Sequence, residues 1–299
     1  MNSELKDYMG GLDVYLEQRD VVEVSLNPSG DIFVERFGVA TEHAGRMSAS
    51  MAERFLRFCA SKNDQSLSAQ DPILSARVPG TMHRLEGLVP PVVRAPTFSI
   101  RLHAARTLPL VEFVRDESIC ELLEAEITAR RNIVVAGSTG SGKTTFVNSC
   151  LATLNELEPA ARILLLEDTP ELQSANANSV AMLAHGNVSL DALLVSSLRL
   201  APDRIVVGEV RTGAVLMTLL KCWNTGHPGG FTTVHANSAE DVLGRFSQLS
   251  GEVTVSEQSA FIHSAIDTIV FLERDLGAPS IRQVLRVHSP DHLETLYAA

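Results

Sequence analysis

Cysteine is scarce in this sequence, with four residues in 299, at positions 59, 120, 150 and 222. They lie far apart and none forms a CxxC pair, which excludes a zinc module built from paired CxxC motifs. So few and so scattered cysteines also argue against a disulfide framework. This usage is typical of proteins from a reducing cytoplasm.

Long hydrophobic runs are missing as well. No apolar stretch approaches the roughly 20 residues that a membrane-spanning helix needs, so no transmembrane segment is predicted. The first ten residues carry Glu4 and Asp7 and have no apolar core, so a signal peptide is not expected there. We therefore expect a cytoplasmic protein, whose attachment to any membrane would be peripheral and through partner proteins.

Basic residues are few relative to acidic ones. The chain has 25 Lys and Arg against 36 Asp and Glu, a formal net charge of −11. A nucleic-acid-binding domain carries a basic footprint, so this balance argues against direct binding of nucleic acid. At roughly 100–200 residues per domain, the length predicts two domains.

A small α+β domain is predicted over residues 1–105, which hold 11 basic and 13 acidic residues. Side chains alternate in residues 22–26 and again in 31–36. A turn of Asn, Pro, Ser and Gly separates the two stretches, so a β-hairpin is predicted. Residues 88–93, which contain two prolines, and residues 97–102 are predicted to be edge-type strands.

A larger α/β domain is predicted over residues 106–299, which hold 14 basic and 23 acidic residues. Short aliphatic runs lie at 132–136, 162–166 and 204–207, separated by helical patterns. This alternation predicts a mostly parallel sheet covered by helices. Ligands of such sheets bind beyond the carboxyl ends of the strands, and each run here ends in a glycine-rich or acidic turn.

The strongest motif follows the first of these strands and matches the phosphate-loop pattern G-x-x-x-x-G-K-[ST]. Its residues are Gly137, Ser138, Thr139, Gly140, Ser141, Gly142, Lys143 and Thr144, followed by Thr145. Glycines let backbone N–H groups converge on phosphate oxygens at a helix N-terminus. Lys143 places a cation at the β- and γ-phosphates, and the Thr144 hydroxyl is a ligand for Mg²⁺. The motif predicts a site for ATP with Mg²⁺.

Acidic residues end the next two strands. Glu167 is a candidate to hold Mg²⁺ with Thr144 or to orient water, although residues 168–171 (DTPE) also fit an ordinary helix start. Residues 204–211 (RIVVGEVR) look like a Walker B strand in which Gly208 replaces the common Mg²⁺-holding Asp. Glu209 is the first candidate for the general base that polarises water, and Glu167 is the second. A salt-bridged strand end is the alternative for Glu209.

Two basic side chains are further candidates for the site. Arg211 can balance the charge of the γ-phosphate. His235 ends a short strand after the glycine-rich loop 226–230. It is predicted to sense the γ-phosphate through a hydrogen bond to the nucleotide or to Glu209, with a satisfied core histidine as the alternative. His227, beside a proline in that loop, is interpreted as structural.

In their order, these motifs resemble the type II/IV secretion ATPases, and among them the TrbB-type conjugal-transfer ATPases. The matching segments are the phosphate loop at 137–145, LLLEDTPEL at 164–172, the Walker B strand at 204–211 and GHPGGFTTVHANS at 226–238, with similar stretches at 21–38, 84–101 and 197–211. The resemblance implies an N-terminal domain over a RecA-like P-loop ATPase domain, with nucleotide between them. It also implies a hexameric ring, inner-membrane type IV secretion components as partners, and a nucleotide contact by Arg101.

The sequence departs from this family at two places. TrbB-type proteins usually read Ile-Arg-Lys-Pro where this chain has Ile-Arg-Leu-His at 100–103, so a second basic contact is missing. After Arg211, the usual Gly-x-Glu-Ala is replaced by Thr-Gly-Ala-Val, and any role of that glutamate is lost.

The sequence therefore predicts a motor that hydrolyses ATP to ADP and phosphate and powers a type IV secretion or conjugal-transfer apparatus. The missing Walker B Asp leaves open a nucleotide-gated scaffold that binds ATP with little turnover. A pilus-retraction-type ATPase is the nearer alternative, against which the GHPGG loop argues. A DNA helicase or packaging motor needs a basic channel. The excess of acidic residues in 106–299 argues against such a channel.

Overall fold

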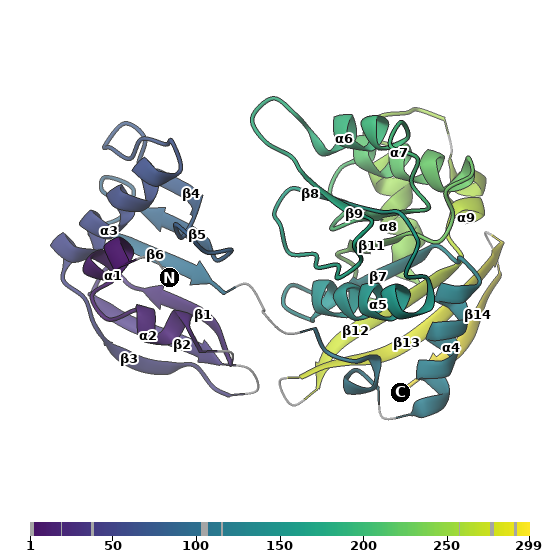
Figure 1. The fold of residues 1–299 in the computed structure, drawn as a ribbon, viewed down its shortest axis with the longest axis horizontal. Helices are drawn as coiled ribbons and strands as arrows, with labels where there is room; N and C mark the ends of the chain where they lie inside the picture. The colour runs from purple at the N-terminus through teal and green to yellow at the C-terminus, as the bar shows by residue number, and fades with distance from the viewer. Residues whose placement is uncertain are drawn as a thin grey trace. The chain divides into compact units, whose positions relative to one another are not determined.

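The computed structural model describes residues 3–18, 20–36, 39–102, 107–114, 116–256, 258–275, 278–289 and 292–299. The chain folds as two compact units, residues 1–106 and 107–299, each with its own sheet and core (Figure 1). The predicted boundary between residues 105 and 106 falls within 103–106, outside the described residues.

The first unit is an antiparallel sheet with helices packed on it. In the described residues the strand order is β3-β2-β1-β6-β5-β4. The predicted hairpin is present as β1 and β2, and the buried side chains Phe55, Leu56 and Cys59 of α3 lie in the core against the sheet. The elements are α1 (Ser3–Met9), α2 (Asp13–Leu16), β1 (Val21–Leu26), β2 (Asp31–Arg36), β3 (Glu42–Arg46), α3 (Ala49–Lys62), β4 (Ile73–Arg77), β5 (Arg84–Leu88) and β6 (Thr97–Arg101).

The prediction of edge-type strands around the prolines is wrong. β5 and β6 are both interior strands of the sheet. β5 ends at Leu88, so Pro90 and Pro91 lie in the loop that leads to β6. Because proline cannot donate to a strand ladder, the strand ends before the first of them and both of its edges stay paired.

The second unit is an α/β layer structure. Among the described residues its sheet has the order β14-β13-β12-β7-β11-β10-β8-β9, parallel from β12 to β9 and antiparallel at β13 and β14. The elements are a 3₁₀ turn η1 (Leu110–Glu112), α4 (Glu117–Thr128), β7 (Ile133–Gly137), α5 (Lys143–Leu157), β8 (Ile163–Glu167), β9 (Ser179–Leu183), α6 (Leu190–Ser197), β10 (Arg204–Val207), α7 (Gly213–Asn224), β11 (Phe231–Val234), α8 (Asp241–Ser250), α9 (Ser259–Ala265), β12 (Thr268–Asp275), β13 (Ala278–Ser289) and β14 (His292–Ala298).

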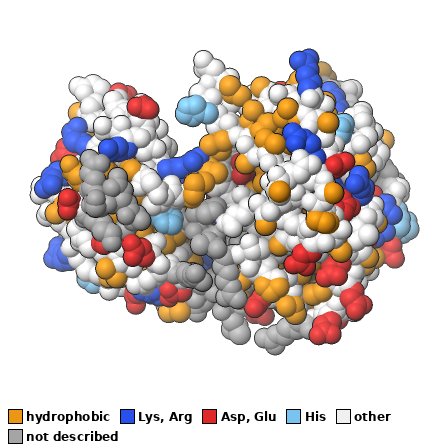
Figure 2. Space-filling model, in the orientation of Figure 1, with side chains coloured by type: hydrophobic (Ala, Val, Ile, Leu, Met, Phe, Trp, Pro, Cys, Tyr) orange, Lys and Arg blue, Asp and Glu red, His pale blue; other side chains and the backbone are white. Residues whose placement is uncertain are grey.

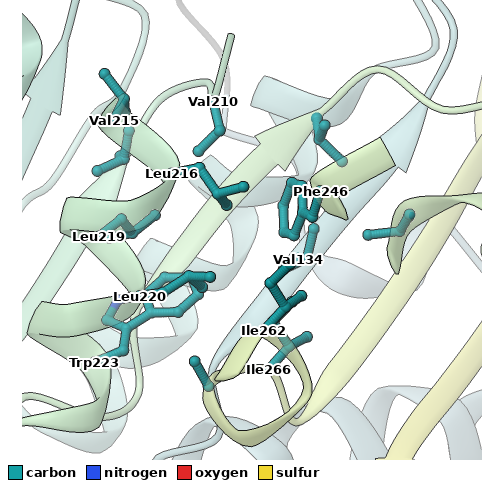
Figure 3. Close-up of a cluster of buried hydrophobic side chains, with 14 of the residues drawn as sticks. Val134, Val210, Val215, Leu216, Leu219, Leu220, Trp223, Phe246, Ile262 and Ile266 are labelled. Atoms are coloured by element: carbon teal, nitrogen blue, oxygen red, sulfur yellow. The ribbon is translucent and has the colours of Figure 1, made fainter. Parts of the chain in front are cut away.

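Helices cover both faces of this sheet. α4 and α5 pack on one face through an apolar cluster that includes Phe113 and Phe146. On the other face, α6 to α9 pack through a second apolar cluster that includes Trp223 of α7, Phe246 of α8 and Val134 of the central strand β7 (Figure 3). With both faces buried, the strands read as continuous aliphatic runs, as predicted for a parallel sheet.

The surface carries charges of both signs. On the face in view in Figure 2, acidic and basic side chains are interspersed with neutral and apolar ones. Within the described ranges, no helix combines the length and the apolar character that crossing a bilayer requires.

Candidate nucleotide site

The candidate site lies where four neighbouring parallel strands end. The strands β7, β11, β10 and β8 are adjacent in that order, and their carboxyl ends lead to the phosphate loop, His235, Glu209 and Glu167 respectively. Residues that are up to about 100 positions apart in the chain are therefore brought to one edge of one sheet.

The phosphate loop turns from β7 into α5. Gly142 is the N-cap residue of α5 and has φ +96°, a left-handed conformation that glycine adopts without strain. The first N–H groups of α5 are not needed within the helix, and together with the helix dipole they favour an anion. Ser141 Oγ is buried and has no hydrogen-bond partner among the described residues. This cradle fits the phosphates of a nucleotide.

Lys143 is buried, with 8% of its surface exposed. Its Nζ donates hydrogen bonds to the carbonyl oxygens of Gly137, at 2.9 Å, and Ser138, at 2.7 Å. Its third contact is His235 Nδ1, at 3.3 Å. The ammonium group is thus held by the loop itself and by the end of β11.

His235 joins the lysine to Glu209. An ammonium group only donates hydrogen bonds, so Nδ1 of His235 is the acceptor in this contact, and Nε2 is the ring nitrogen that can donate to Glu209. Nε2 is 3.0 Å from Glu209 Oε1. The other oxygen of Glu209 accepts from Nε of Arg211 at 2.9 Å and from its terminal nitrogen at 2.6 Å. Lys143, His235, Glu209 and Arg211 therefore form one continuous chain of polar contacts.

The charge of Arg211 is stabilised by its surroundings. The hydrogen bonds to Glu209 raise the pKa of the guanidinium above its usual value, and the nearby charges of Asp168 and Glu171 act in the same direction. Since the group also remains about half exposed, it is a permanent cation next to the carboxylate rather than a proton donor.

A second group of contacts connects Thr144 to two carboxylates. The Thr144 hydroxyl donates to Glu171 Oε2 at 3.1 Å. The backbone N–H groups of Glu171 and Leu172 both donate to Glu167 Oε1, at 2.8 Å each, and Glu167 is buried. Hydroxyl and carboxylate oxygens are ligands that suit Mg²⁺. The oxygen ligands at this edge therefore fit Mg²⁺, with Glu171 in contact with Thr144 and Glu167 hydrogen-bonded to the backbone of Glu171.

The missing Walker B Asp has a steric explanation. β8 and β10 pair in parallel with Val207 opposite Leu166, so Gly208 follows directly beside Glu167. A Cβ at position 208 would lie 3.1 Å from Cγ and 3.2 Å from Oε1 of Glu167, closer than ordinary contact. The buried Glu167 side chain would have to shift by a few tenths of an ångström to admit a side chain at 208.

The glycine-rich loop precedes β11, whereas His235 follows it. The loop therefore lies at the opposite edge of the sheet, where β11 begins. Its backbone packs on buried polar groups. Gly229 donates its N–H to Asn132 Oδ1 at 2.7 Å and accepts from the fully buried Arg204 at 3.0 Å. The loop therefore anchors β11 and does not join His235 at the candidate site.

Gly230 gives a direct test of this structural role. A Cβ there would lie 2.2 Å from the Ile205 carbonyl oxygen and 2.2 Å from Trp223 Nε1. We expect Gly230→Ala to destabilise the second unit by about 1–3 kcal/mol, the usual cost of overpacking a core. Gly244 is the control, because it is an exposed residue of α8 with open space around its Cα. Gly244→Ala should stabilise by about 0.5–1 kcal/mol, and scanning calorimetry of both variants measures the difference. Equal unfolding temperatures would contradict the packing argument.

The remaining predicted residues lie as follows. Ser138 and Thr139 are exposed at the tip of the phosphate loop, and Thr145 is half-buried in the first turn of α5. Arg101 is the last residue of β6 in the first unit, and its side chain is exposed.

Sequence reasoning missed three residues of the site. Asn148 lies one helical turn after Thr144 and donates to the Glu171 carbonyl at 3.0 Å, a spacing that could have indicated it. Glu171, noted only as part of a possible helix start, contacts Thr144. Arg274 of β12 donates to the Gly140 carbonyl at 2.6 Å, and no motif marks it.

Comparisons with known proteins agree with this architecture. The family model described as "Type II/IV secretion system protein" matches residues 16–280. The chain is 41% identical over 303 residues to the conjugal transfer protein TrbB of Rhizobium radiobacter, covering 99% of this chain and 94% of that protein. It is 30% identical over 331 residues to the type IV secretion system protein PtlH of Bordetella pertussis, covering 96% and 95%.

A solved structure shares the fold. The ATPase DotB of Legionella pneumophila superposes with a TM-score of 0.70 at 17% identity, covering 94% of this chain and 81% of that one. At that identity the likeness concerns the fold. The family match spans most of the chain, and the relatives align along nearly their whole length. The chain therefore belongs to the type II/IV secretion system protein family.

Proposed function

We propose that this chain binds ATP with Mg²⁺, hydrolyses it to ADP and phosphate, and uses the cycle to drive a type IV secretion or conjugal-transfer apparatus. The observation that carries the proposal is the chain of contacts from Lys143 through His235 to Glu209. It connects a phosphate loop to a carboxylate suited to orient water. A binding scaffold without turnover has no need of such a connection.

Each residue of the site has a role in this proposal. Lys143 and the N–H groups of the loop hold phosphate oxygens. Thr144, with Glu171 and Glu167, holds Mg²⁺, which when bound neutralises charge on the phosphates. Glu209 accepts a hydrogen bond from the attacking water. Arg211 and His235 fix the Glu209 carboxylate and link it to the loop.

The relatives support the assignment of the apparatus. The conjugal transfer protein TrbB and the secretion protein PtlH align with this chain along nearly their whole length. We propose that this chain, like them, serves a transfer or secretion machine, working as a ring of about six copies on inner-membrane components.

Two measurements on the purified chain test the proposal. Phosphate release with Mg²⁺ and ATP should saturate with ATP and stop when Mg²⁺ is chelated. Light scattering with a non-hydrolysable ATP analogue should show an assembly near six copies. Tight ATP binding without phosphate release would support the scaffold alternative instead. A strict monomer across micromolar concentrations would contradict the motor.

We also propose that Arg101 contributes to nucleotide binding, as the family resemblance implies. Its guanidinium stays charged and can donate two parallel hydrogen bonds to a phosphate group. We expect Arg101→Ala to weaken ATP binding about tenfold, which equals about 1.4 kcal/mol, with little change in unfolding temperature. The alternative, an exposed arginine in a surface ion pair, is worth about 0–1 kcal/mol of stability.

Arg84 is a matched control for this substitution, because it is also exposed and pairs directly opposite Arg101 between β5 and β6. Arg84→Ala should leave ATP affinity within about twofold of wild type, a change of less than 0.5 kcal/mol on the scale of about 1.4 kcal/mol for tenfold. Isothermal titration with ATP compares the two. If both variants bind as wild type does, Arg101 is a surface residue only.

A further inference from the structure

The hairpin of β12 and β13 touches each of the phosphate-loop glycines that have positive φ. A Cβ on Gly137 would lie 2.4 Å from the carbonyl oxygen of Leu272, and one on Gly142 would lie 2.5 Å from Cβ of Pro279. A Cβ on Gly140 would lie 3.6 Å from a terminal nitrogen of Arg274. The side of the loop that faces this hairpin is therefore covered along its length.

Arg274 makes the polar contact in this set. Its Nε donates to the carbonyl oxygen of Gly140 at 2.6 Å, from a side chain that is otherwise exposed. The carbonyl group of Gly140 and the N–H group of Ser141 belong to one planar peptide unit, so the orientation of the carbonyl determines which way that N–H points. A charged donor on that carbonyl favours one orientation of the loop, since hydrogen bonds of ionised groups are about twice as strong as neutral ones.

A second arginine of the hairpin, Arg282, does not share this contact. Arg282 on β13 lies 3.3 Å from Glu273 and 3.8 Å from Asp275, so it pairs with carboxylates of the neighbouring strand. The described strands of the hairpin thus hold three arginines: Arg274 is directed to the loop, Arg282 is neutralised within the hairpin, and Arg286 pairs with Glu126 of α4. This difference makes a matched pair for experiment.

We propose that Arg274 is a positioning residue for the nucleotide: its hydrogen bond to Gly140 sets the loop in the conformation that receives the phosphates. This inference rests on the proposed ATP binding and deepens it. Lys143 interacts with the first two carbonyls of the loop, and Arg274 with the carbonyl of Gly140. Together the two cations hold carbonyl groups at the start and in the middle of the loop, so N–H groups converge on one point before nucleotide arrives.

The test compares Arg274→Ala, Arg274→Lys and Arg282→Ala in ATP titrations and in steady-state hydrolysis. Arg274→Ala should raise KM and the Kd of both ATP and ADP about tenfold while kcat changes less than about threefold, because the lost interaction orders the binding loop and not the attacking water. Arg274→Lys, which keeps a donor cation, should recover part of the affinity. Millimolar guanidinium should restore affinity to Arg274→Ala, and Arg282→Ala should bind as wild type does.

The outcomes separate this inference from the proposed function. A wild-type chain that neither binds nor hydrolyses ATP would overturn both. A wild-type chain that hydrolyses ATP, together with equal affinities of Arg274→Ala and Arg282→Ala, would overturn the role of Arg274 alone. A fall in kcat without a change in KM would also overturn it, because that result assigns the arginine to the chemical step. Should Arg274→Ala not fold, Arg274→Gln gives the same comparison with the side-chain bulk retained.

Discussion

Lys143→Ala is expected to abolish ATP hydrolysis while leaving the fold intact. The phosphate-loop motif places this ammonium group at the β- and γ-phosphates, where negative charge is concentrated during phosphoryl transfer. In the structure it is buried and in contact with the loop carbonyls, so it acts where water screens charge least. Loss of one preorganised electrostatic donor typically costs about 10²–10³ in rate, and we expect at least the upper end of that range.

Phosphate release and thermal unfolding of the variant, measured side by side, check this expectation. Lys221→Ala is the control, since Lys221 is an exposed lysine of α7. It should retain wild-type turnover. Removal of the Lys143 side chain also removes its hydrogen bond to His235. The unfolding temperature should nevertheless change by only a few degrees. Near-normal turnover of Lys143→Ala would refute the assignment of the active site.

The parts of the site that could be predicted from sequence are those with a local signal. The phosphate loop carries its own motif between a strand and a helix pattern, and the aliphatic runs before Glu167 and Glu209 predicted strands that the structure contains as β8 and β10. Their carboxyl ends were expected to meet because parallel strands place them at one edge. Local residue patterns and parallel-sheet topology were sufficient to predict the phosphate loop and the positions of Glu167 and Glu209 at strand ends.

Contacts that depend on long-range pairing could not be predicted in this way. Arg274 lies 134 positions after Gly140 and reaches it because β12 pairs with β7 in the sheet. No residue pattern in β12 indicates this neighbour. The packing of Glu167 against Gly208 likewise depends on the register between β8 and β10, so the sequence showed a departure from the Walker B pattern without its steric cause.

The glycine-rich loop shows a different limit. Its closeness to His235 in sequence suggests a common role, yet the four residues of β11 carry the chain from one edge of the sheet to the other. At about 3.3 Å per residue a strand of this length separates its ends by more than 10 Å. The segment 226–238 therefore combines a loop that anchors β11 with His235 of the candidate site. The loop and the histidine require separate tests.

Glu209→Gln is expected to lower kcat by about 10²–10⁴-fold, the usual range for a lost general base, with ATP affinity close to that of wild type. The substitution keeps the size of the side chain. Its amide oxygen can still accept one hydrogen bond, from Arg211 or from His235 Nε2. What it loses is the negative charge that attracts a proton from the attacking water. Because Glu209 lies between His235 and Arg211 rather than on the loop, binding should be spared.

Glu167→Gln is the control that decides between the two carboxylates. Oε1 of Glu167 accepts the N–H groups of Glu171 and Leu172 in a buried position, and a glutamine oxygen can accept the same two bonds. We therefore expect a smaller loss of kcat, with a higher Mg²⁺ concentration needed for full activity because one carboxylate near the ion is neutral. Steady-state phosphate release and ATP titration of both variants give kcat and Kd separately. A large loss of kcat in Glu167→Gln, with near-normal turnover in Glu209→Gln, would reverse the assignment. Equal losses in Glu209→Gln and Arg211→Ala would instead show that Glu209 serves to hold the arginine, because removal of either partner would then have the same consequence.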